Sequence, residues 1–504
     1  MQNLFSATLS KITLLAIVFQ LLINNAAGAP VVGKEKKQNI IFMVSDGMGV
    51  ANVGLAREYN EIVNKVEFPA TLFIEDYLIG TIRTRSNNSL ITDSAAAGTA
   101  LANGFKTYNN AIGVDSDGKP IGSIGEALKL AGYKVGLVVT TSICDATPAV
   151  FAAHAKARYN QSLIAEQLLG LNHPLGRIPD VLIGGGREYF QSNSTNPKGV
   201  RSDGRDLIEE VTSNKTWSYS GDRQSFDALD KGKNISLPFL GLYTEGNYPY
   251  FIDRNSSIPS LAEQVEVAIT ALEEATKDSD QGFFLMIEGS RIDHTGHAND
   301  APAMVKETLE YVDVYKNVVN WAENSDVDTV IVSVSDHETG AVTLNAKKPS
   351  SYQPIINATH SGEYLLDQII NFDGKNDDEK FKQFIKTEIF EDGLGIYDYT
   401  EDEVSRIKNI ELKKKDKISV SLAQITNLTN SRAKIGFASL DHSSVDVNVY
   451  AYANNFRLAY KVRDPETGLG GAHENVDYVT FIESITDINL SEVTEKIQDI
   501  QLVE

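Results

Sequence analysis

Four runs of apolar, largely β-branched residues constrain the fold of this chain more than any other feature. None of them alternates regularly between apolar and polar residues, a pattern typical of strands that are buried on both faces of a sheet. The runs are 39–46 (NIIFMVSD), 134–145 (KVGLVVTTSICD), 282–293 (GFFLMIEGSRID) and 328–337 (DTVIVSVSDH). A fifth run, 180–186 (DVLIGGG), ends in glycines. The sequence therefore predicts a sheet that is covered on both sides.

Helical patterns separate these runs. The segments 123–132 (SIGEALKLAG) and 260–276 (SLAEQVEVAITALEEAT) precede the second and third runs. Alternation of strand and helix predicts an α/β fold, a three-layer α/β/α sandwich with a large, mostly parallel central sheet. Residues 346–432 show polar amphipathic helices with few strand signals, which predicts a helical insertion. A strand pattern returns at 433–453.

The first four runs share the position of an acidic residue. Each run ends in an acidic residue or has one within a few residues of its end. In open α/β sheets the ligand site lies beyond the carboxyl ends of the strands. We therefore expect these strand ends to converge on one site.

Charge and cysteine content exclude several classes of function. A formal net charge of −22, from 46 basic and 68 acidic residues, argues against a protein that binds nucleic acid or an anionic membrane by general electrostatic attraction. An anionic substrate would need local positive charge, and bound metal cations are the strongest source of it. The single cysteine, Cys144, excludes an intramolecular disulfide and a cysteine-based zinc site.

The N-terminal residues 1–29 have the layout of a secretory signal segment. The apolar stretch 12–23 follows Lys11, precedes the small residues NNAAGA, and is short for a membrane span. An uncleaved N-terminal anchor is the alternative, because Pro30 directly follows the expected cleavage point. Together with nine N-x-S/T sequons, the segment predicts a glycoprotein of the secretory pathway that is secreted, vacuolar or on the cell surface.

Carboxylates and imidazoles gather where two of the runs end. Asp46 lies in SDGMG, where two glycines permit a tight turn near a ligand, although an aspartate there could simply cap the next helix. IEGSRIDHTGH contains Glu288, Asp293, His294 and His297. Asp293 and His297 stand four apart, so both could reach one cation if the segment is helical. A surface loop is the alternative reading of this segment.

Two further segments extend the candidate metal site. Asp336 and His337 are adjacent in SDHETG, and His442 lies in LDHSS on the returning strand. A solvated turn and an edge-strand histidine are the alternatives. Nitrogen and oxygen ligands of this kind suit Zn²⁺. Mg²⁺ prefers hard oxygen ligands, which are offered here by Asp46, Thr147 and Glu288.

Ser94 and Arg158 suggest what such a site could act on. Ser94 follows an aspartate and opens an alanine-rich stretch that should be helical, so it is either a helix cap or a nucleophile held where a helix N-terminus binds an anion. Arg158 lies ten residues after Pro148 in CDATPAVFAAHAKAR. A lone arginine commonly pairs with a surface acid, but near a phosphate it offers a bidentate fork. His154, in the same stretch, is assigned no role.

Taken together, SDGMG, TDSAAAGTA, DATPA with its following arginine, EGxxIDxxxH, SDHETG and the late histidine resemble the alkaline phosphatase family in content and order. VVTTSICDATPA and IEGSRIDHTGH are closest to the fungal vacuolar-type members. The resemblance covers about 38–345 and 433–485. It implies a single α/β/α domain at 38–504, a homodimer, and metal-dependent hydrolysis of phosphate monoesters through a phosphoserine.

The resemblance also implies a role for each candidate residue. Ser94 would be the nucleophile, and Arg158 would hold the phosphoryl oxygens. Two Zn²⁺ and one Mg²⁺ per subunit would be bound, one zinc by Asp293, His297 and His442, the second by Asp336 and His337, and magnesium by Thr147 and Glu288, with Asp46 shared between the second zinc and magnesium. His294 stands at a position that varies in the family and would contact phosphate directly or through water.

Two alternative functions are compatible with these residues. A phosphodiesterase or nucleotide pyrophosphatase could use the same metal scaffold, but Arg158 disfavours it because a diester lacks one of the free oxygens that the fork needs. A non-catalytic, metal-stabilised cell-surface protein would leave the serine of DSAAA unexplained.

Overall fold

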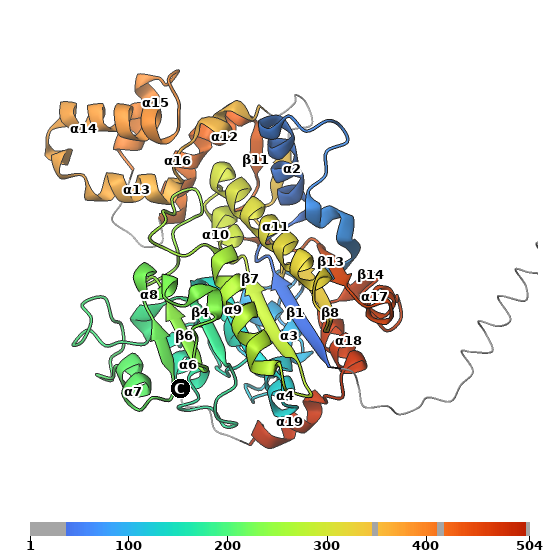
Figure 1. The fold of residues 1–504 in the computed structure, drawn as a ribbon. Coiled ribbons are helices and arrows are strands. Elements are labelled where there is room, and N and C mark those ends of the chain that lie inside the picture. The colour runs from blue at the N-terminus through green and yellow to red at the C-terminus, as the bar shows by residue number, and fades with distance from the viewer. Residues whose placement is uncertain (1–36, 345–350, 411–417, 500–504) are drawn as a thin grey trace, which may run out of the picture. The chain divides into compact units, whose positions relative to one another are not determined.

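A sheet of ten strands organises the part of the chain that the computed structural model describes, residues 37–344, 351–410 and 418–499 (Figure 1). The strand order is β14-β2-β13-β8-β1-β7-β3-β4-β6-β5. β13 runs antiparallel to β2 and β8, whereas the other neighbouring pairs are parallel. The strands are β1 (Gln38–Val44), β2 (Leu78–Arg83), β3 (Lys134–Ser142), β4 (Val181–Gly185), β5 (Ser218–Ser220), β6 (Phe239–Leu242), β7 (Phe283–Glu288), β8 (Asp328–Val334), β13 (Val447–Ala453) and β14 (Gly471–Glu474). The predicted α/β fold with a large, mostly parallel sheet is confirmed.

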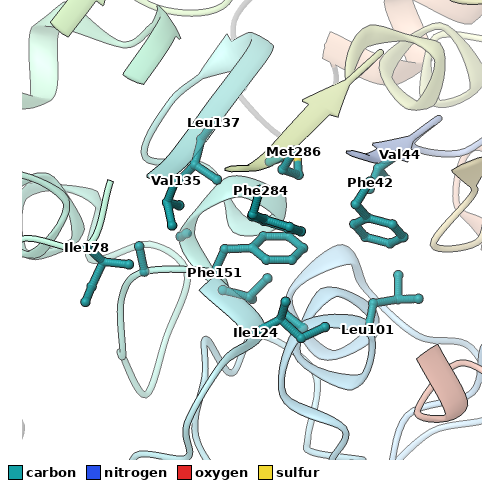
Figure 2. Close-up of a cluster of buried hydrophobic side chains, with 14 of the residues drawn as sticks. Phe42, Val44, Leu101, Ile124, Val135, Leu137, Phe151, Ile178, Phe284 and Met286 are labelled. Atoms are coloured by element: carbon teal, nitrogen blue, oxygen red, sulfur yellow. The ribbon is translucent and has the colours of Figure 1, made fainter. Parts of the chain in front are cut away.

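Side chains of the central strands enter two separate hydrophobic layers. In β1, Ile40, Phe42 and Val44 belong to one layer and Ile41 and Met43 to the other, and all five are fully buried. This two-sided burial is the reason why the strand runs show no alternation of apolar and polar residues. Figure 2 shows part of the first layer, in which the rings of Phe42, Phe151 and Phe284 pack together.

Helices complete each hydrophobic layer. The first layer is covered by α3 (Ser94–Asn103), α4 (Ile124–Leu130), α18 (Asp477–Ile485) and α19 (Leu490–Ile497). The second is covered by α2 (Val50–Asn64), α9 (Leu261–Thr276) and α11 (Ala301–Glu323). The sheet therefore lies between two helical layers, as predicted. No helix of the described residues is long and apolar enough to cross a membrane.

The predicted strand run 282–293 extends beyond the carboxyl end of the strand that the structure contains. β7 ends at Glu288, and α10 (Arg291–His297) begins three residues later. At the break, Gly289 passes so close to the ring of Tyr311 that an added Cβ would lie 2.6 Å from a ring carbon. Asp293 and His297 therefore stand on one helical turn, the condition under which their spacing lets them share a ligand.

A group of helices follows β10 (Val342–Leu344) and leads back to β11 (Ile435–Phe437). It consists of α12 (Gln353–Asn357), α13 (Gly362–Asn371), α14 (Asp378–Phe384), the π-helical segment Ile385–Gly393, α15 (Glu401–Lys408) and α16 (Ile418–Ala433). The helices from α13 to α16 enclose an apolar cluster of their own. They also hold the end of α10, because Thr426 Oγ1 donates a 3.0 Å hydrogen bond to the Ala298 carbonyl and Arg291 pairs with Glu363 at 2.7 Å. The predicted signal segment 1–29 lies outside the described residues.

Candidate active site

The ends of four adjacent strands carry predicted site residues to one place. Asp46 follows β1, Glu288 ends β7, and Asp336 follows β8. Thr147 lies on α5 (Ala146–Ala149), which follows β3. Thr147 Oγ1 lies 3.5 Å from Asp46 Oδ2, and the Gly47 N–H donates a 3.2 Å hydrogen bond to Asp336 Oδ1. The expected convergence of the strand ends is confirmed.

One group of metal-capable side chains contains Asp293, His297 and His442. The Nε2 atoms of His297 and His442 lie 3.3 and 3.4 Å from carboxylate oxygens of Asp293 and 3.1 Å from each other. Each ring uses Nδ1–H to donate to a backbone carbonyl, His297 to Leu440 at 2.6 Å and His442 to Thr92 at 2.8 Å. Those bonds point both Nε2 atoms into the group, the orientation of a metal ligand.

The second metal-capable group contains Asp46, Asp336 and His337. His337 Nε2 lies 3.2 Å from Asp336 Oδ2 and 3.7 Å from Asp46 Oδ1. Thr339 Oγ1 donates to Asp293 Oδ1 at 2.5 Å and stands 3.2 Å from His337 Nδ1. The threonine oxygen accepts the Nδ1 proton of His337, so the Nε2 atom of His337 carries no proton and can bind a metal.

The carboxylates at the strand ends fit bound cations. Asp46 Oδ1, Glu288 Oε2 and Asp336 Oδ2 are buried and have no hydrogen-bond partner within the described part of the chain. Burial, and next the charge of Asp336, raise the pKa of Asp46 well above its ordinary value. Burial, reinforced by Asp145 and Asp336, raises the pKa of Glu288 to about 8. Buried carboxylates that repel one another in this way are stabilised by positive ions placed among them.

Ser94 is the first residue of α3, but it does not cap the helix. The N-cap is Asp93, whose Oδ1 accepts a 3.0 Å hydrogen bond from the Ala96 N–H. Of the two roles considered for Ser94, the helix cap is excluded. The Ser94 hydroxyl is therefore free for another role, and its Oγ lies 3.2 Å from His337 Nε2. The nucleophile candidate thus adjoins the second metal-capable group, at a helix N-terminus.

Arg158 reaches the same place from a loop. Its Nη1 donates to Asp93 Oδ2 at 3.3 Å and its Nη2 to Asp145 Oδ1 at 3.0 Å. The side chain is 21% exposed, so the guanidinium is oriented by two carboxylates while part of it still faces solvent. Burial opposes ionisation of Asp145, but Arg158 outweighs it and lowers the pKa of that carboxyl. The arginine pairs with acids of the site rather than with surface acids.

His294 lies on α10 between the two metal-capable residues of that helix. Burial, and next the positive charge of Arg291, lower its pKa to about 4. The imidazole is therefore neutral at physiological pH, and it interacts with Asp145. Its contact with phosphate stays a prediction.

Three contributors to the site were missed by the sequence analysis. Asp93 was noted only as the aspartate before Ser94, yet its second oxygen orients Arg158. Thr339 links Asp293 to His337, and the Thr92 carbonyl orients His442. Thr339 stands two residues after His337, on the same face of an extended segment, and this spacing was the available signal.

Known proteins resemble this chain over most of its length. A family model described as alkaline phosphatase matches residues 37–488. The chain belongs to the alkaline phosphatase family. It is 46% identical over 484 residues to the repressible alkaline phosphatase of Saccharomyces cerevisiae, an alignment that covers 92% of this chain and 84% of the yeast protein. It is 38% identical over 474 residues to an alkaline phosphatase of Schizosaccharomyces pombe, covering 92% and 84% of the two chains.

A solved alkaline phosphatase structure has the same fold. The enzyme from Thermus thermophilus superposes with a TM-score of 0.74 at 26% sequence identity, covering 92% of this chain and 95% of that one. Membership of the family makes the chain a metal-dependent phosphoric monoester hydrolase. This is the first of the three functions considered from the sequence.

Proposed function

We propose that this alkaline phosphatase forms a covalent phosphoserine on Ser94 and uses two Zn²⁺ and one Mg²⁺. The observation that carries the proposal is the position of the Ser94 hydroxyl, which is released from capping by Asp93 and lies 3.2 Å from His337 Nε2. A serine hydroxyl is a weak nucleophile at its ordinary pKa and needs activation at such a position.

The donor sets suit the proposed ions. Asp293, His297 and His442 would hold one zinc, and Asp336 and His337 the other. Asp46 would be shared with magnesium, which takes the remaining oxygens of Thr147 and Glu288. Nitrogen and carboxylate donors favour zinc, whereas an all-oxygen set favours magnesium. When bound, such ions supply Lewis acidity that lowers the pKa of the attacking hydroxyl and balances charge on the leaving oxygen.

The chain's own residues account for binding and orientation. The Ser94 hydroxyl gives up its proton to solvent, and its oxygen attacks phosphorus as the bond from phosphorus to the ester oxygen breaks. The leaving alkoxide then takes a proton from solvent and departs as the alcohol. Water then attacks the phosphoserine, which restores Ser94 and releases inorganic phosphate. In both steps the Arg158 fork and the N–H groups at the start of α3 stabilise charge on the phosphoryl oxygens.

The Arg158→Ala variant tests the phosphate fork. We expect the inhibition constant for inorganic phosphate to rise roughly 10- to 100-fold, the usual worth of hydrogen bonds to a charged group, with a smaller loss for an aryl phosphate diester than for the matching monoester. Steady-state kinetics at alkaline pH measures both. Arg205→Ala is the matched control, because Arg205 pairs with Glu166 and Glu210 outside the site. An unchanged inhibition constant in Arg158→Ala, or a wild-type preference for the diester, would contradict the proposal.

The N-terminal segment and the nine sequons support a further proposal, that the enzyme is a glycoprotein of the secretory pathway, either secreted, vacuolar or on the cell surface. The family resemblance supports a homodimer. N-terminal sequencing, a glycosidase mobility shift and light scattering test these points. An intact Met1 terminus would favour the anchor. An unchanged mobility would show that the protein carries no N-linked glycans, and a monomeric mass would contradict the homodimer.

A further inference from the structure

A third buried group of titratable side chains is also spaced closely enough to hold a metal ion, and it lies apart from the two groups described above. It contains Glu126 of α4, His154 and His173. Glu126 Oε1 lies 2.9 Å from His154 Nε2 and 3.0 Å from His173 Nε2, and all three side chains are at most 1% exposed. Charged groups this deeply buried are costly unless they are paired. The group therefore calls for a functional or structural reason.

The hydrogen bonds around the two rings define where the protons are. His173 Nδ1 accepts from the Leu175 N–H at 3.1 Å, which places the proton of that ring on Nε2; this atom lies 3.0 Å from Glu126 Oε1 but makes no hydrogen bond to any described residue. His154 Nδ1 stands 2.7 Å from the Gly113 carbonyl and must donate to it. The bond between His154 Nε2 and Glu126 Oε1 needs one more proton, and this proton lies on His154, because burial opposes the charged ring but Glu126 outweighs it and raises the pKa of the histidine. The group thus holds a buried imidazolium–carboxylate ion pair.

His154 also joins two chain segments, 110–113 and 153–158. Its backbone N–H donates to Gln167 Oε1 at 2.7 Å, and its carbonyl accepts from Gln167 Nε2 at 2.8 Å. Next to it, Ile112 and Ala155 exchange two backbone hydrogen bonds of 2.9 Å as an antiparallel bridge. The ion pair therefore stands at one end of two paired backbone segments.

The other end of the paired segments is the phosphate fork. The Arg158 N–H donates to the Asn110 carbonyl at 2.8 Å, and the Asn110 N–H donates to Asp93 Oδ2 at 3.0 Å. That same oxygen accepts from Arg158 Nη1. Thr99 of α3 adds a brace, because its hydroxyl donates to the Ala111 carbonyl and accepts from the Gly113 N–H, each at 3.0 Å. The segments thus connect the buried ion pair to Arg158 and to the helix that carries Ser94.

We propose that Glu126 and His154 are positioning residues for phosphate binding, which act by holding the paired segments 110–113 and 153–158 so that Arg158 faces the position next to Ser94. The inference rests on the proposed role of Arg158. It differs from a purely structural role in one respect: loss of the ion pair should weaken phosphate binding only while Arg158 is present.

A double-mutant cycle with Glu126→Gln and Arg158→Ala tests this dependence on the holoenzyme. Glutamine keeps the shape of Glu126 and an oxygen for the Ser123 N–H but removes the charge. We expect Glu126→Gln to raise the inhibition constant of inorganic phosphate about tenfold in the wild-type background and to leave it unchanged in the Arg158→Ala background, as for coupled residues. His154→Asn is the second variant, because its amide can still donate to Gly113 while nothing reaches Glu126.

Glu310→Gln is the matched control, since it removes a buried carboxylate that pairs with Arg254 at 2.7 Å, away from the two segments. It should lower the melting temperature and leave the inhibition constant unchanged. Equal effects of Glu126→Gln in both backgrounds, or no effect in either, would overturn the inference, and His154→Asn decides by the same criteria if Glu126→Gln does not fold. If Arg158→Ala alone leaves phosphate inhibition unchanged, the fork itself fails and the inference fails with it. If Arg158→Ala raises the inhibition constant but the effects of the two substitutions are independent, the proposed role of Arg158 holds and only the inference about Glu126 and His154 fails.

Discussion

Replacement of Ser94 with alanine is expected to lower the turnover of phosphate monoesters by on the order of 10⁴-fold or more, the scale found when a covalent nucleophile is removed. The fold should survive, because the cap of α3 is the Asp93 carboxylate and not the serine hydroxyl. Loss of activity would then report chemistry rather than stability. The measurements are kcat on an aryl phosphate at alkaline pH and the mass of the protein after an acid quench during turnover.

A serine that does cap a helix provides the control for Ser94→Ala. Ser260 caps α9 by accepting from the Glu263 N–H at 3.3 Å, and it lies outside the site. Ser260→Ala should lower stability by about 1 kcal/mol, as cap substitutions do, and leave kcat unchanged. Near-normal turnover by Ser94→Ala, or a phosphate adduct that persists in that variant, would assign the nucleophile elsewhere.

Local pattern was sufficient to predict the central strands and to bring most of the candidate site residues to one place. The strands β1, β3, β7 and β8 are buried on both faces, so apolar and polar residues do not alternate along them. Their continuous apolar runs could therefore be recognised from the sequence alone. Acidic residues at their ends then indicated a shared site, because parallel strands end at one edge. The division of the metal-capable residues into two groups came from the family resemblance, and the structure gathers them in the same two groups.

Contacts between distant segments had no such local signal. The antiparallel direction of β13 within a mostly parallel sheet depends on the long connection before it, which sequence pattern does not resolve. The orientation of Arg158 depends on backbone bonds to Asn110, a residue with a left-handed φ of 79° that no motif marks. His154 was assigned no role because a histidine in such a stretch is more often a structural residue, and its partner Glu126 lies 28 positions away. Such pairs emerge only when the fold is known.

Removal of the metal ions is expected to abolish turnover as completely as the loss of Ser94, by at least about 10³-fold, because Lewis-acid stabilisation contributes several kcal/mol to reactions of this kind. Dialysis against a chelator, followed by metal analysis and an activity assay, measures the loss. Added Zn²⁺ and Mg²⁺ should restore activity. Dialysis without chelator is the control, and full activity in protein shown to be free of metal would overturn the metal-dependent mechanism.

The metal-free enzyme should also become less stable as pH rises, and the sign follows from the buried carboxylates. Burial, and next Asp293, raise the pKa of Asp336 to about 6, while Glu288 reaches about 8. A carboxyl with a raised pKa in the folded state binds more protons folded than unfolded, so folding is progressively disfavoured between about pH 4 and pH 8. Bound cations take the place of those protons and should flatten the dependence. Thermal melts from pH 5 to pH 9 with and without metal test this, and parallel curves would show that the carboxylates are not held together by cations.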